Sequence, residues 1–264
     1  MTNYKNLEVE QQGAVRRLWL NRPQVRNAFN DELIAEIAAA FADIEATTDT
    51  RVVVVAARGP AFCAGADLNW MRAMAGFSHA DNHNDALKVA RMFNAVHACS
   101  KPVIALVQGD AFGGGVGLVA ACDLAVCVDS ASFVLSEVRL GIVAATISPH
   151  IVRAMGARQA ARFMLTAEKF SATQARELGL VHEVVAAAAL EAQVDSLVNS
   201  LLAASPAALA TTKRLLADVI EFPVDDVLLA ATAKCIADAR VSPEGRAGIA
   251  AFLEKRVPPW APRK

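Results

Sequence analysis

The chain has 264 residues, of which 55% are hydrophobic and 20% charged, a balance typical of a well-packed globular protein rather than a disordered one. A formal net charge of −1 does not suggest the basic face that nucleic acids or anionic membranes attract, so we expect neither as a partner. No apolar run is long enough to span a bilayer, the first ten residues lack the apolar stretch of a signal peptide, and five cysteines without a CxxC pair fit free thiols in the cytoplasm.

Strand and helix patterns alternate along the first 200 residues. The pattern predicts a hairpin over 7–10 and 14–20, a helix over 31–46, a strand over 51–57, helices over 67–75 and 81–99, and strands over 103–107, 124–128 and 132–135. From about Ser148 the chain is mainly Ala/Leu-rich helix with one apolar break at 180–185, and a last helix begins at Ser242. We therefore predict an α/β core over residues 1–200 and a helical C-terminal region over 201–264.

Two segments share one design, in which a buried strand leads through a Gly/Ala-rich loop into a helix. They read VVVVAARGPAFCAGADL (52–68) and PVIALVQGDAFGGGVGL (102–118). The first N–H groups of such helices lack partners and lie at the positive end of the helix dipole. Two of these ends facing one point would form an oxyanion hole, although the glycines could instead serve only tight packing of strand and helix.

A dinucleotide site is the rival reading of the second loop. Gly113 and Gly115 follow a strand, and Glu137 falls roughly where a ribose-binding acid would stand, but the third glycine position holds Leu118. No GK[ST] sequence is present, which excludes a P-loop. His79 and His83 have the spacing of a metal pair without an evident third ligand, so we expect no metal site.

Five segments together resemble the crotonase, or enoyl-CoA hydratase/isomerase, superfamily. They are LNRPQVRNAFN, AFCAGADL, VQGDAFGGGVGLVAACDLAV, FVLSEVRLGI and ATQARELGLVHEVV, and they occur in the order of that family. The resemblance implies an α/β spiral of ββα repeats with a helical C-terminal region that packs homotrimers or dimers of trimers. It also implies an acyl-CoA substrate, with no cofactor beyond the coenzyme A that is part of the substrate.

The resemblance also assigns the binding residues. It implies that the backbone N–H groups of Ala66 and Gly114 hold the thioester oxygen. It places coenzyme A along the turn 22–28 and the loop 64–68, with contacts from Arg22, Arg26, Ala28, Ala64, Asp67 and Leu68. Near the C-terminus, Phe252 and Lys255 match an aromatic residue and a lysine that contact coenzyme A in relatives, often from a neighbouring subunit.

Glu137 is the expected catalytic carboxylate, the alternative being a surface glutamate paired with Arg139. Familiar hydratases of the family carry a second glutamate where this chain has Gly117, which cannot transfer a proton. Hydration of an enoyl-CoA is the preferred reading, and Δ3,Δ2-isomerisation by one base or a non-catalytic CoA-binding or RNA-associated role stays open. Trp70 and Met71 are candidates to line an acyl tunnel.

The sequence looks most similar to hydratases of glutaconyl-type CoAs, namely methylglutaconyl-CoA hydratase of leucine breakdown and isohexenylglutaconyl-CoA hydratase. Such substrates carry a second carboxylate, which would need a cationic or hydrogen-bonding subsite. The candidates for that subsite are Arg72, Arg139 and His150.

Overall fold

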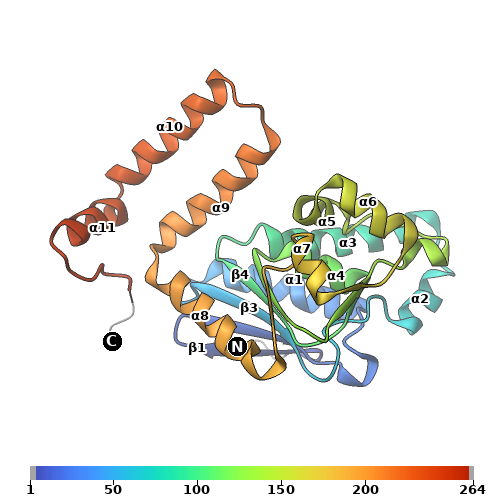
Figure 1. Ribbon diagram of the computed structural model, residues 1–264. Coiled ribbons are helices and arrows are strands. Elements are labelled where there is room, and N and C mark those ends of the chain that lie inside the picture. Colours follow the sequence, from blue (N-terminus) through green and yellow to red (C-terminus); the bar gives the residue numbers. More distant parts are fainter. Residues whose placement is uncertain (1–3, 262–264) are drawn as a thin grey trace.

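A six-stranded sheet forms the centre of the α/β core in the computed structural model, which describes residues 4–261 (Figure 1). Its strands run in the order β1 (Leu7–Gln12), β2 (Val15–Leu20), β3 (Val52–Ala57), β4 (Val103–Val107), β6 (Leu124–Val128) and β9 (Glu183–Val185). Among the described strands of this sheet, β1 and β2 pair antiparallel and all other neighbours pair parallel. A second, three-stranded sheet contains β5 (Ala111–Phe112), β7 (Ser132–Val134) and β8 (Phe170–Ser171).

Every residue of β3 and β4 is buried, as the uninterrupted Val, Ile and Ala runs of these strands predict for parallel strands covered on both faces. Helix α8 (Leu190–Ala203) packs against β3, β4 and β6. On the other side lie α1 (Asp31–Ala46), α3 (His79–His97) and α4 (Gly114–Ala121), with α1 against α3 and α3 against α4 (Figure 1).

The remaining helices are short elements around the core and a long C-terminal series. The α-helices are α2 (Leu68–Met74), α5 (Ser148–Met155), α6 (Ala157–Thr166), α7 (Ala172–Glu177), α9 (Pro206–Glu221), α10 (Asp226–Val241) and α11 (Pro243–Leu253). Three short 3-10 turns are η1 (Pro23–Val25), η2 (Glu137–Leu140) and η3 (Ala187–Ala189). The order and type of the predicted elements are confirmed.

Element boundaries differ by a few residues from those predicted. β1 extends to Gln12, two residues further than predicted, so the hairpin turn is limited to Gly13 and Ala14, and the φ of +56° at Gly13 suits glycine. α3 begins at His79 because Ser78 and Asp81 form a reciprocal capping box. Of the apolar stretch at 180–185, only Glu183–Val185 is a strand.

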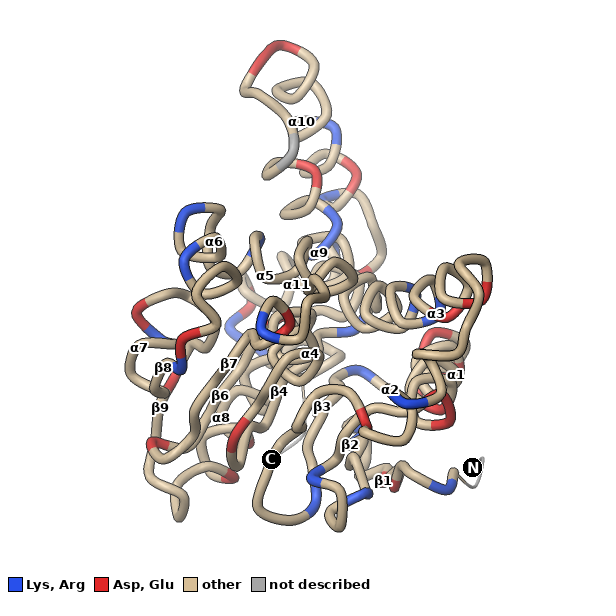
Figure 2. Tube along the Cα trace, turned by 90° about the vertical axis from the view of Figure 1, so that its right-hand side faces the viewer, with Lys and Arg blue, Asp and Glu red and all other residues tan. Residues whose placement is uncertain are grey.

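Helices α9, α10 and α11 form an arm that extends away from the sheet (Figures 1 and 2). At its base, the Lys213 ammonium binds the Asp123 carboxylate at 2.6 Å. Many apolar side chains on the arm are exposed, including Leu216, Ile220, Phe222, Val224, Val227, Leu229, Ile236, Ile249, Phe252 and Leu253. Exposed apolar surface on this scale is typical of an interface.

Residue 200, the predicted domain boundary, lies inside α8, and the division into two regions stays a prediction. Within residues 4–261, no helix combines the length and apolarity needed to cross a membrane.

Candidate active site

The turn 22–28 and the loop 64–68 are joined by backbone hydrogen bonds, although some forty residues separate them in sequence. The Ala64 N–H donates to the Arg26 carbonyl at 2.9 Å, and the Phe29 N–H donates to the Gly65 carbonyl at 2.7 Å. In return, the Asp67 N–H donates to the Phe29 carbonyl at 2.8 Å. The two segments to which the resemblance assigned coenzyme A therefore form one continuous backbone surface.

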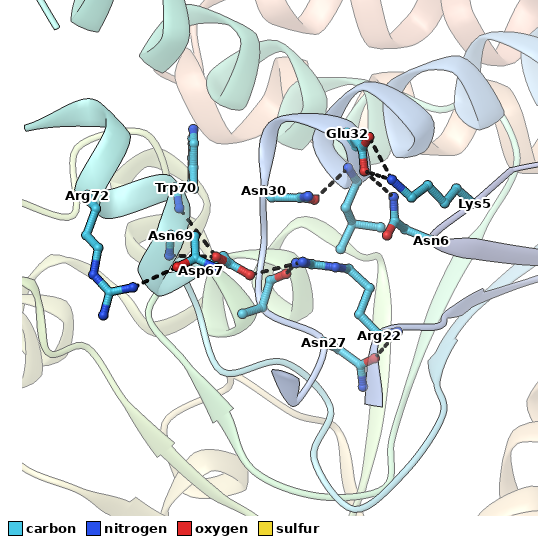
Figure 3. Close-up of polar contacts among 12 residues, drawn as sticks. Lys5, Asn6, Arg22, Asn27, Asn30, Glu32, Asp67, Asn69, Trp70 and Arg72 are labelled. Carbon is cyan, nitrogen blue, oxygen red and sulfur yellow. Dashed lines mark hydrogen bonds and ion pairs between the residues drawn. The ribbon is translucent and has the colours of Figure 1, made fainter. Parts of the chain in front are cut away.

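A buried ion pair also joins the turn 22–28 to the loop 64–68 (Figure 3). The Arg22 guanidinium lies 3.0 Å from the Asp67 carboxylate and also donates to the Ala28 carbonyl, and the two side chains are only 13% and 8% exposed. Asp67 also caps α2 by accepting from the N–H groups of Asn69 and Trp70. Burial alone would raise the pKa of Asp67, but the hydrogen bonds from the Asn69 N–H and Arg22 hold it below its ordinary value. The two charges neutralise each other, so Arg22 and Asp67 position the loops.

The two glycine loops converge, as the sequence predicted. The Phe112 N–H donates to the Cys63 carbonyl at 2.8 Å, and a β-carbon on Gly65 would lie 3.0 Å from the Phe112 carbonyl oxygen. Gly65 has a φ of +87° and Gly113 a φ of +50°, conformations that side chains disfavour. The glycines therefore permit both the turns and the close approach of one loop to the other.

Ala66 and Gly114 line the same cavity. Gly114 is the first residue of α4, so its N–H has no partner inside the helix. Within residues 4–261, neither the Ala66 N–H nor the Gly114 N–H donates a hydrogen bond to another protein group. The cavity thus contains two unoccupied backbone donors, one from each loop, as an oxyanion hole requires.

Glu137 extends from η2 into this cavity. Its Oε1 atom lies 3.0 Å from the position that a β-carbon on Gly113 would occupy, and its Oε2 atom is buried without a hydrogen-bond partner in the described part of the chain. Burial raises the pKa of Glu137, opposed only by its own backbone N–H. No ion pair with Arg139 forms among the described residues, so the alternative of a surface ion pair is wrong.

The cavity holds about 430 Å³, and apolar side chains dominate it. Trp70 and Met71 line it, as expected if the cavity is the acyl tunnel. One face of α3 forms a wall that the sequence analysis missed, consisting of Asn82, Asp85, Ala86, Val89 and Phe93. Their spacing of three, one, three and four residues is the periodicity of a single helix face, and this signal could have revealed the wall.

None of the three candidates for a second carboxylate subsite lines the cavity. Arg72 donates to the Asn69 side chain at 2.7 Å on the surface, and Arg139 is exposed. His150 is buried against His97, with ring centroids 5.2 Å apart, and burial followed by the nearby His97 and Arg153 lowers its pKa to about 4. The prediction that one of them faces the acyl group is wrong. Among the described residues, no Lys, Arg or His lines this cavity.

The position of the second hydratase glutamate is closed to any side chain. A β-carbon on Gly117 would lie 2.2 Å from the Cγ2 atom of Ile147 and 3.5 Å from the Phe93 ring. Ile147 is buried and lines the cavity, so it occupies the space that a longer residue at position 117 would need. The cavity wall here is apolar.

The remaining candidates lie at the mouth of the cavity or outside it. Leu68 is 69% exposed at the mouth of the cavity, whereas Phe252, 84% exposed, and Lys255 lie at the end of the arm and outside the cavity of their own chain. The His182 ring lies outside the cavity and accepts a hydrogen bond from the Ala125 N–H at 3.1 Å. Within 4–261, no group of three or more potential metal ligands forms around His79 and His83 or elsewhere.

Two free donors, a buried carboxylate beside them and an apolar cavity define a site suited to acyl-thioester chemistry. The family model for enoyl-CoA hydratase/isomerase matches residues 10–263, and the chain belongs to this family. Its fold matches the crystal structure of an enoyl-CoA hydratase from Shewanella pealeana with a TM-score of 0.94 and 40% identity, covering 97% of this chain and 96% of that one. The α/β crotonase fold is thereby confirmed.

Relatives with different activities are similar to the chain. An enoyl-CoA hydratase structure from Mycobacterium smegmatis matches with a TM-score of 0.91 and 35% identity, covering 97% of this chain and 99% of that one. A peroxisomal Delta(3,5)-Delta(2,4)-dienoyl-CoA isomerase of Arabidopsis thaliana is 33% identical over 86% of this chain and 87% of its own length. The chain is thus similar both to hydratases and to an isomerase.

Proposed function

We propose that the chain hydrates a 2-enoyl-CoA, with Glu137 as the base and the N–H groups of Ala66 and Gly114 as the oxyanion hole. The observation that carries the proposal is the buried Glu137 carboxylate beside the Gly113–Gly114 turn, with one oxygen unpartnered and a raised pKa. A carboxylate in this state is suited to exchange protons near neutral pH. The two free donors lie where the thioester oxygen would gain charge.

These groups can hydrate the substrate in two proton transfers. Glu137 removes a proton from water while the water oxygen bonds to the β-carbon. The electrons of the C=C bond then join the α-carbon to the carbonyl carbon, and the carbonyl electrons move onto the thioester oxygen. The N–H groups of Ala66 and Gly114 stabilise that oxyanion, and each donor contributes about 3 kcal/mol. The protonated Glu137 then delivers its proton to the α-carbon. The hydroxyl groups of Ser136 and Thr146 also line the cavity and could hold the water.

Coenzyme A would lie over the surface made by the turn 22–28 and the loop 64–68. Arg26 and Leu68 are exposed there, whereas Arg22 and Asp67 act through their ion pair. We propose that the arm packs against other copies in a trimer or a dimer of trimers, bringing Phe252 and Lys255 to a neighbour's coenzyme A. The exposed apolar side chains of the arm support this assembly.

A direct test mixes the purified protein with crotonyl-CoA and follows the ultraviolet absorbance of the conjugated thioester. Loss of absorbance, together with a 3-hydroxyacyl-CoA product, is expected for hydration. Increased absorbance from a 3-enoyl-CoA would indicate isomerisation instead. No change with any enoyl-CoA while coenzyme A thioesters still bind would favour the non-catalytic alternative.

Isomerisation is the second candidate because the wall at Gly117 and Ile147 is apolar. One carboxylate is enough to move a proton from the α-carbon to the γ-carbon. Replacing Gly117 by Glu and Ile147 by Ala together makes room for a second carboxylate. If the wild type is an isomerase, this double variant should raise the ratio of hydration to isomerisation by about tenfold or more, since one added acid–base group is worth that much. The single Ile147→Ala variant is the control.

A glutaconyl-type substrate finds little support in the charges of the cavity. Its second carboxylate would face the carboxylates of Glu137 and Asp85 and, among the described residues, no cation in the lining. An enoyl chain without a second carboxylate fits the cavity better.

A further inference from the structure

The acyl cavity has a polar far end. Along α3 it runs from Phe93, 3.8 Å from the position of a β-carbon on Gly114, to Asp85 and Asn82. Eight residues separate Asp85 from Phe93, so a rise of 1.5 Å per residue places Asp85 about 12 Å further along the helix. Between these ends the lining is apolar, with Met71, Met74, Ala86 and Val89 among its residues.

Three polar groups meet at this end, and their hydrogen-bonding capacity is only partly used. The Trp70 indole N–H is buried and lies near the Asp85 carboxylate, but among the described residues it makes no hydrogen bond of good geometry. The Asp85 carboxylate is partly buried, and burial raises its pKa although the contact from the Trp70 N–H opposes this shift. The amide nitrogen of Asn82 donates to the Phe77 and Ser78 carbonyls, which leaves its carbonyl oxygen as an acceptor.

The possible terminal groups of an acyl chain differ in how well they would fit between these side chains. A hydroxyl group has one donor and two acceptor sites, so a single hydroxyl can accept from the Trp70 N–H while it donates to Asp85. A methyl group would leave the buried N–H with only its poorly aligned contact to Asp85, which is unfavourable for a buried donor. A carboxylate would be repelled by Asp85, and an ammonium group could not accept from Trp70.

We propose that Trp70, Asp85 and Asn82 form a subsite that selects enoyl-CoA substrates with a hydroxyl group at the far end of the acyl chain. This inference rests on the proposed function, from which it takes the enoyl-CoA substrate. It adds the chemical class of the acyl chain. An extended chain advances about 1.2 Å per bond, so 12 Å corresponds to about eight to ten carbons between the thioester and the hydroxyl group. Trp70 and Asp85 also line the polar surface pocket beyond, so they separate that pocket from the acyl cavity.

The experiment compares ten-carbon 2-enoyl-CoAs that end in methyl, hydroxyl or carboxylate. The wild type should favour the hydroxyl over the methyl substrate by about tenfold in kcat/KM, as expected for a hydrogen-bonding site that is partly open to water. It should use the carboxylate substrate least. Because each value is a ratio on one protein, a general loss of activity cancels.

Two substitutions remove one polar group each; Asp85→Asn keeps the size of the side chain, whereas Trp70→Phe keeps an aromatic ring but makes it smaller. Trp70→Phe should bring the hydroxyl-to-methyl ratio toward one, and Asp85→Asn should do the same while improving use of the carboxylate substrate. Asn84→Ala is the matched control, since Asn84 neighbours Asp85 but lines only the surface pocket. A wild-type ratio near one, or a ratio that neither substitution changes, would overturn the proposal.

Binding of the corresponding saturated acyl-CoAs, which cannot react, separates this inference from the proposed function. A preference for the hydroxyl chain in the dissociation constants without any turnover would reject the hydratase and isomerase reactions but support the subsite. Turnover of all three enoyl chains at equal kcat/KM would support the chemistry and reject the subsite.

Discussion

The Oε1 atom of Glu137 lies 3.0 Å from where a β-carbon on Gly113 would stand. The expected base and the turn that presents the oxyanion donor are therefore in contact, and Gly113 has a φ of +50° that a side chain disfavours. The proposed catalytic carboxylate and the proposed backbone donor therefore lie next to each other.

Gly113→Ala should therefore reduce kcat more than it weakens substrate binding. The added methyl group would displace the Glu137 carboxylate and strain the turn before Gly114. We expect kcat to fall by about 100-fold, comparable to the loss of one oxyanion donor. Steady-state kinetics with crotonyl-CoA measures this change. Gly141→Ala is the control, because its φ is also positive while its β-carbon would meet no atom within 4 Å. Equal effects of both substitutions would contradict the positioning role.

Glu137→Gln should abolish turnover, lowering kcat by at least about 100-fold, while coenzyme A thioesters still bind. In the wild type, kcat/KM should fall as the pH drops through the raised pKa of Glu137, above the ordinary value of 4.5. A pH–rate profile measures this acidic limb. An acidic limb with its midpoint at or below pH 4.5 would show that burial does not raise the pKa of Glu137.

The same variant should be more stable than the wild type at neutral pH. The folded-state pKa of Glu137 is raised, so the protonated form favours folding and its stabilising contribution is lost as the pH rises through that pKa. Glutamine avoids the burial of a charge, so the melting temperature of Glu137→Gln should exceed that of the wild type at pH 7. The difference should vanish below about pH 4, where both states of the wild type are protonated. A melting temperature unchanged at pH 7 would argue against desolvation of the carboxylate.

Asp67→Asn should destabilise the protein by about 3 kcal/mol, because it leaves the buried Arg22 charge without its partner. It should also reduce kcat, since the loop that carries the Ala66 N–H is held by this pair. Urea unfolding measures the first effect. Asp43→Asn is the matched control, since Asp43 pairs with Arg16 but is 62% exposed, and its loss should change stability by less than about 1 kcal/mol. Equal losses would show that the burial of the Arg22–Asp67 pair is unimportant.

Val227→Asp should disrupt assembly. Val227 is 77% exposed on the arm, and a charge there would oppose its burial against another copy. Light scattering should show an oligomer for the wild type and a smaller species for the variant. Leu165→Asp, at a position 74% exposed on α6 of the core, should leave the mass unchanged. A wild type with the mass of a single chain would refute the proposed assembly.

The order of the elements and the two glycine loops could be predicted from the sequence by itself, because they depend on local chemistry, such as helix periodicity and the need for glycine at positive φ. The choice of Glu137 came from the resemblance of its segment to a known family, since the residues alone also allowed a surface ion pair with Arg139. The tertiary structure alone decided that Arg22 binds Asp67, that Ile147 fills the space beside Gly117, and that Asp85 ends a cavity lined by no cation from residues 4–261. Each depends on side chains from elements distant in sequence, and only packing decides which of them meet.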